Sequence, residues 1–85
     1  MEKMRNQLIV KLVELNLLVD LFNINNTNVH SKKLEVMGLL KDINILNGTA
    51  TPEVIDDINA IENFNREECK TFVDNNLKIL FGEKE

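Results

Sequence analysis

The chain has 85 residues, of which 44% are hydrophobic and 28% charged, a balance typical of a globular protein and not of a disordered one. Its net charge is −4, with eight Lys and only two Arg, which argues against a general binder of nucleic acid or of an anionic membrane. The absence of Trp and Tyr from the sequence also argues against a binding surface rich in aromatic anchors.

Cellular location is inferred from the cysteine content and the N-terminal segment. A single cysteine, Cys69, excludes an internal disulfide, which fits a reducing compartment. The N-terminal apolar stretch is interrupted by Lys11, Glu14, Asn16 and Asp20, so it predicts neither a signal peptide nor a membrane span. We expect a cytoplasmic protein. The thirteen Asn residues are typical of an AT-rich genome, such as that of a low-GC bacterium, its phage or a large DNA virus. If the protein is viral, the expected location is the host cytoplasm.

The first half of the chain predicts two helices. A Leu-rich run over about 3–24 contains no Gly or Pro and ends in the Asn-rich segment 23–28, whose side chains compete for backbone hydrogen bonds. A second helix is predicted over about 32–47. Ser31 is a suitable N-cap for it, and Gly48 follows where a left-handed C-cap is favoured.

Two further helices are predicted over about 52–64 and 66–81. The first begins with Thr51 and Pro52, an N-cap threonine followed by proline at the first helical position. The second begins with Asn65, and Glu68 stands three residues later, as in a capping box.

The fold class follows from these elements. No run alternates apolar and polar residues in the way a strand requires. The connections are short, so successive helices should lie roughly antiparallel. We therefore predict an all-α protein with a single domain over 1–85, in which about four helices form a small antiparallel bundle completed by self-association.

The prediction of self-association depends on the first helix. At 100° per residue, Gln7, Lys11 and Glu14 share one side of it, and the early apolar residues lie on the other. In the second half of the helix, Leu18 and Phe22 continue the side of the three polar residues. The apolar stripe thus moves half-way round the helix, and one flat core cannot bury both parts.

The second helix carries a comparable extra stripe. Leu34, Gly38 and Ile45 align opposite its main apolar side, and a glycine inside a helix suggests that another helix packs close there. Exposed apolar patches of this kind usually mark interaction sites. The alternative is that the first helix kinks near Leu15 and Asn16, or runs through the centre of the bundle.

Residues that carry catalytic or metal chemistry are few. Cys69 lies on an apolar stripe beside Glu67 and Glu68, which oppose thiolate formation, so a buried structural thiol is expected. His30 stands before a predicted helix start among polar residues, where a solvated or capping role is expected. One His and one Cys do not make a zinc site. We expect no enzyme activity, no metal and no cofactor.

The third predicted helix is acidic and contains no Lys or Arg, which argues against its use as a DNA recognition helix. Its acidic side chains are either a solvated surface or a face that docks on a basic partner: Glu53, Asp56, Asp57 and Glu62.

The sequence thus predicts a non-enzymatic helical interaction module that associates with itself and acts as an adaptor, regulator or inhibitor of another protein. The self-association or partner-binding residues are Leu18, Phe22, Leu34, Gly38 and Ile45. An alternative is an oligomer that binds a small metabolite or nucleotide, with Asn16, Asp20 and Asn23 lining the pocket. A weaker alternative is DNA binding through Arg66, Lys70 and Lys78.

Overall fold

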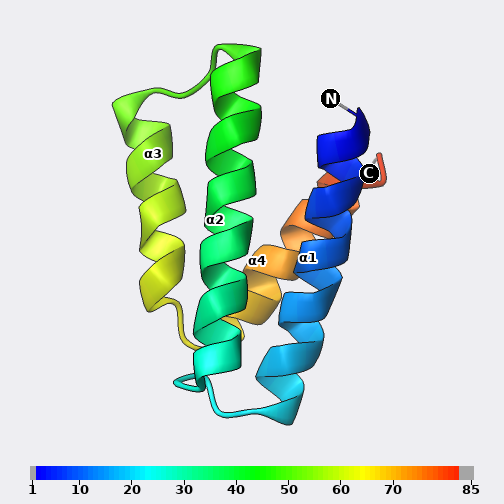
Figure 1. Cartoon of the computed structure of the whole chain (residues 1–85), viewed down its shortest axis with the longest axis vertical. Coiled ribbons are helices and arrows are strands. Elements are labelled where there is room, and N and C mark those ends of the chain that lie inside the picture. Colours follow the sequence, from blue (N-terminus) through cyan, green and yellow to red (C-terminus); the bar gives the residue numbers. More distant parts are fainter. Residues whose placement is uncertain (1, 83–85) are drawn as a thin grey trace.

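The structure is a computed structural model and describes residues 2–82. In this part of the chain it contains four α-helices, one short 3-10 segment and no strand, which confirms the predicted all-α class (Figure 1). The elements are α1 (Glu2–Leu21), α2 (Thr27–Asn47), α3 (Pro52–Asn59), the 3-10 segment η1 (Ala60–Asn63) and α4 (Arg66–Leu80).

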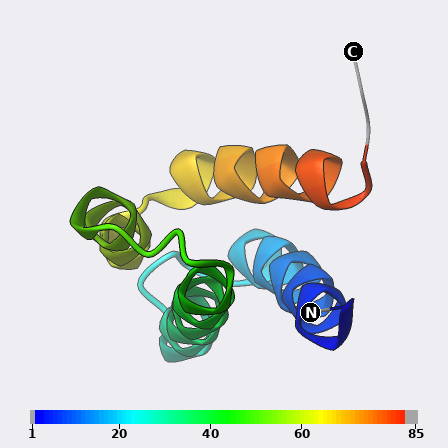
Figure 2. The same cartoon turned by 90° about the horizontal axis from the view of Figure 1, so that it is seen from above.

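Helices α1 and α2 lie side by side and run in opposite directions, and α3 runs along the other flank of α2 (Figure 1). Helix α4 does not extend this row. It crosses one side of the α1–α2 pair obliquely and packs mainly on α1 (Figure 2). No helix of the described residues covers the opposite side of the α1–α2 pair (Figure 2).

The predicted end of α2 and the predicted starts of α3 and α4 are confirmed. The side chain of Thr51 accepts a hydrogen bond from the backbone N–H of Val54, and Pro52 occupies the first turn of α3. Asn65 and Glu68 form a complete capping box at the start of α4. Gly48 takes a left-handed conformation, with a φ of 72°, and ends α2.

The helix bounds on either side of the Asn-rich connection differ from the sequence-based prediction. Helix α1 ends at Leu21, and α2 begins at Thr27 with Asn26 as its N-cap, not after Ser31. The Asn26 side chain accepts a hydrogen bond from the backbone N–H of Asn28 at 2.8 Å. Several residues of the Asn-rich connection can cap a helix, and the earliest effective cap adds a turn to α2. His30 therefore lies inside α2.

The third predicted helix is shorter than expected. After Asn59 the chain tightens into η1, which ends at Asn63. Backbone groups at a helix end commonly pair in this tighter way. The turn brings Phe64 back toward the interior, where it packs against the main core and against a smaller buried cluster of Met37, Ile58 and Ile61.

The core lies where α1, α2 and α4 meet. Helix α1 contributes one straight buried stripe, Leu8, Leu12, Leu15 and Val19, with spacings of four, three and four residues. The predicted half-turn shift of the apolar stripe is therefore wrong. Leu18 flanks this stripe and packs against the core. The helix runs without interruption through Leu15 and Asn16, so it has no break at that point.

One charged side chain is buried in this core. Lys33 of α2 is only 4% exposed, and its ammonium donates hydrogen bonds to the backbone carbonyls of Glu62 at 3.2 Å and Phe64 at 2.7 Å. These carbonyls belong to the end of η1 and the residue after it, where helical partners are missing. Lys33 thus ties the end of η1 to α2.

Candidate functional site

The surface that lacks a covering helix carries apolar side chains from α1. Val10, Val13, Leu17 and Leu21 are between 42% and 73% exposed. Their spacings of three, four and four residues place them on one side of α1, about 180° from the buried stripe. Helix α1 is therefore apolar on two opposite sides, and only one of these faces the core.

Helix α2 adds to the same surface. Leu34 and Ile45 are exposed, and a Cβ atom built on Gly38 would meet no atom within 4 Å apart from its chain neighbours and the nearby backbone of α2. Val10, Leu34 and Gly38 line one open groove between α1 and α2, with a volume of about 730 Å³. We call the exposed stripes on these two helices the outer face: Val10, Val13, Leu17, Leu21, Leu34, Gly38 and Ile45.

Charged side chains form the seam between α1 and α2. Lys11 contacts Glu35 at 2.7 Å, and Lys32 contacts both Glu14 at 2.8 Å and Glu35 at 3.0 Å. The hydrogen bonds that Lys32 donates to Glu14 and to Glu35 raise the pKa of Lys32, and those that Lys11 and Lys32 donate to Glu35 lower the pKa of Glu35. Two cations and two anions thus neutralise one another within the chain, beside the groove of the outer face.

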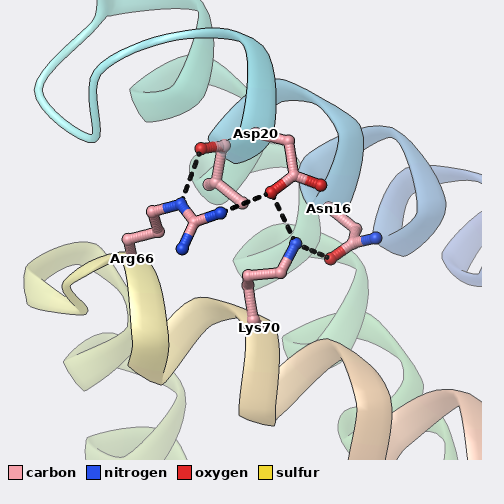
Figure 3. Close-up of polar contacts among 5 residues, drawn as sticks. Asn16, Asp20, Arg66 and Lys70 are labelled. Carbon is pink, nitrogen blue, oxygen red and sulfur yellow. Dashed lines mark hydrogen bonds and ion pairs between the residues drawn. The ribbon is translucent and has the colours of Figure 1, made fainter.

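A second polar junction joins α1 to α4 (Figure 3). Asp20 accepts hydrogen bonds from Lys70 at 2.7 Å and from Arg66 at 2.8 Å. Lys70 also donates to the side chain of Asn16, and Arg66 donates to the backbone carbonyl of Val19. Asn16 and Asp20, predicted to line a ligand pocket, are therefore held by α4 in this structure. Arg66 and Lys70, considered for DNA binding, are turned toward α1.

The Asp20 junction should make stability sensitive to acid. Hydrogen bonds from Lys70 and then Arg66 lower the pKa of Asp20 below its ordinary value of 3.8. A carboxyl with a lowered folded-state pKa stabilises the fold above its unfolded pKa, and this contribution is lost as the pH falls through the folded value. We expect Asp20→Asn to be less stable than wild type in urea near neutral pH, with the difference shrinking below about pH 4. A difference that stays constant with pH would refute this role for Asp20.

The four predicted acidic docking residues do not form one cluster. Glu53, Asp56, Asp57 and Glu62 are all exposed. Asp57 faces a groove between α3 and α4, whereas Glu62 lies 3.9 Å from the imidazole of His30 on α2. The 3-10 segment after Asn59 changes the course of the chain, so Glu62 points in a different direction from Asp57.

Cys69 and His30 lie in different settings. Cys69 is fully buried in the core, and its burial raises the pKa of its thiol, an effect that Lys33 opposes and Glu68 reinforces. His30 is half-exposed. Within residues 2–82, no three His, Cys, Asp or Glu side chains are grouped so that they can hold a metal ion.

We expect the Cys69 thiol to react with a thiol reagent such as DTNB only when the fold opens, because the thiol is buried and its pKa is raised. Adding urea should make it fully reactive. Cys69→Ala should destabilise the fold by about 1 kcal/mol through a small cavity. Rapid reaction of the native protein would contradict the buried position.

Comparisons with known proteins add no functional information. No protein-family model matches the chain, and no curated protein or solved structure is significantly similar to it. No helix in the described residues is long and apolar enough to cross a membrane.

Of the predicted self-association residues, Leu34, Gly38 and Ile45 lie on the outer face, and Phe22 is exposed just after α1. The sequence-based prediction missed the exposed stripe of α1. The signal was present as apolar residues at positions 10, 13, 17 and 21. The pattern hides it because polar residues such as Lys11 and Glu14 are normally expected to face solvent, whereas here they face the α1–α2 seam.

Proposed function

We propose that the protein is a non-enzymatic helical interaction module that associates with a second copy of itself through the outer face and acts on another protein as a regulator, adaptor or inhibitor. The observation that carries this proposal is the row of four exposed apolar side chains on α1: Val10, Val13, Leu17 and Leu21. Burying one Leu side chain is worth about 1.5–3 kcal/mol, a large amount for a small domain.

A second copy suits this surface for two reasons. The charged residues of the seam beside the groove already neutralise one another within the chain. A second copy carries the same neutralised seam, so it brings no unpaired charge into the interface. In a two-fold symmetric dimer the same patch lies on both sides of the interface, so each apolar residue of the patch is buried in both copies.

Gly38 tests the proposal because its two expected effects have opposite signs. The position of its Cβ is open within the chain, so Gly38→Leu should stabilise α2 by about 0.5–1 kcal/mol through higher helix propensity. The same side chain should block the close approach of a second helix at the groove and weaken association.

The measurement is light scattering over a concentration series, combined with urea unfolding at low protein concentration. Wild type should rise from 9.8 kDa toward twice that mass, and Gly38→Leu should stay near the lower value while unfolding at higher urea. A wild type that remains at 9.8 kDa at tens of micromolar would remove the self-association part of the proposal.

A further inference from the structure

A second apolar groove lies between α3 and α4, away from the outer face. It consists of two hollows that share Phe64 and Phe72. The first hollow is lined mainly by α3 and η1, and includes Val54, Ile58 and Ile61; the second lies along the first turns of α4. We call the two together the α3–α4 groove.

The floor of the groove is apolar and contains two aromatic rings that pack against each other. Phe64 and Phe72 meet edge to face, with ring centroids 5.8 Å apart and an interplanar angle of 66°. Both rings are only partly buried, and Leu40 and Val54 beside them are also partly exposed. The floor therefore leaves apolar surface open to a partner.

The rim of the groove is acidic. Asp57 lines it from α3, and Glu67 and Glu68 line it from α4. Glu53 lies one turn before Asp57 on the same side of α3. None of the lining residues in the described part of the chain is basic.

The nearby cations are held elsewhere. Arg66 and Lys70 of α4 are bound to Asp20 of α1, and Lys33 is buried against the carbonyls at the end of η1. Helix α4 thus directs Arg66 and Lys70 toward α1, whereas its acids Glu67 and Glu68 line the groove. Within residues 2–82, Asp57 and Glu67 form no ion pair, so their charge is available to a partner.

We propose that the α3–α4 groove binds a cationic amphipathic segment of a partner protein, with apolar side chains on the Phe64–Phe72 floor and Lys or Arg side chains against the acidic rim. The apolar floor and the rim of one sign together define this occupant, since charge complementarity governs its approach and the floor supplies buried contact. The inference rests on the proposed role as an interaction module, but it does not require self-association, because the outer face is a different surface.

A suitable probe is a fluorescein-labelled helical peptide of about 14 residues, or four turns, with Leu on one side and Lys on the other. Fluorescence anisotropy should show saturable binding that weakens with salt. A peptide with Glu in place of Lys should not bind. Asp57→Lys should raise the Kd about tenfold, because it reverses a charge on the rim.

Asp74→Lys is the matched control. It changes the net charge by the same amount as Asp57→Lys. The altered residue is an exposed acid of α4 that pairs with Lys78 and does not line the groove. Its Kd should stay near the wild-type value. Equal weakening by Asp57→Lys and Asp74→Lys would show attraction to net charge alone and overturn the proposal, as would the absence of saturable binding.

A third variant separates this proposal from the first. Leu17→Glu alters the outer face, so it should bind the peptide as wild type does even where it no longer self-associates. Loss of peptide binding in folded Leu17→Glu would place the peptide on the outer face and refute the groove. If the wild type proves to be monomeric but still binds the peptide, the result supports the groove proposal and refutes only self-association.

Discussion

Leu17→Glu should abolish self-association while leaving the monomer folded. Leu17 is 55% exposed at the middle of the α1 row, so glutamate is tolerated in the free chain but places a charge in the proposed interface. In a symmetric dimer the change occurs twice. Losing two buried Leu contacts of at least about 1.5 kcal/mol each weakens association about a hundredfold or more.

Ile79→Glu provides the control for this variant. Ile79 is 74% exposed, more than Leu17, but it lies on α4 and outside the outer face. Sedimentation equilibrium at matched concentrations should give wild-type masses for Ile79→Glu and monomer masses for Leu17→Glu. Equal masses for all three proteins, or an equal loss in both variants, would show that the outer face has no special role.

Leu15→Ala should destabilise the fold by about 2–5 kcal/mol, the usual effect of removing a fully buried leucine. Leu15 is 0% exposed and stands in the stripe that α1 directs into the core. Leu17→Ala, only two residues away, should change the stability of the monomer by no more than about 0.5 kcal/mol.

The comparison is made by urea unfolding at protein concentrations low enough to exclude association. It tests the rotation of α1 about its axis, because the two leucines lie on opposite sides of the helix. Similar losses of stability in both variants would mean that both side chains are buried, as in a helix wrapped by the rest of the chain.

Local chemistry explains why the end of α2 and the starts of α3 and α4 could be predicted. The caps at Thr51 and Asn65 and the left-handed turn at Gly48 depend on residues that are neighbours in sequence. The start of α2 was harder, because the Asn-rich connection offers several competing caps. The choice of Asn26 over Ser31 adds a turn that carries Val29 into the core.

The orientation of α1 could not be predicted from hydrophobic pattern alone. The rule that polar residues face water fails where they pair across a helix seam, as Lys11 does with Glu35 and Asp20 does with Lys70. Both flanks of α1 carry such pairs, and the side left to water is apolar. These partners are far apart in sequence, and only the packing of the helices identifies them.

The two candidate surfaces have different proposed roles: the outer face in self-association and the α3–α4 groove in binding a partner. The outer face is apolar and neutralised along its seam, whereas the α3–α4 groove combines an apolar floor with Asp57 and Glu67, which have no ion-pair partner among residues 2–82. A dimer formed through the outer face leaves both copies of the groove accessible, because α4 lies on the other side of the α1–α2 pair (Figure 2). Such a dimer would present two equivalent sites, which increases avidity for a partner with two basic segments.

The most direct test of the proposed function is an isotope-filtered NOE experiment on a mixture of labelled and unlabelled protein, which detects only contacts between copies. We predict NOEs between copies at the methyl groups of the α1 row: Val10, Val13, Leu17 and Leu21. The methyl groups of Val54 and Ile79, on the other surfaces, should show none. Contacts between copies confined to α3 or α4, or none at millimolar concentration, would contradict self-association through the outer face.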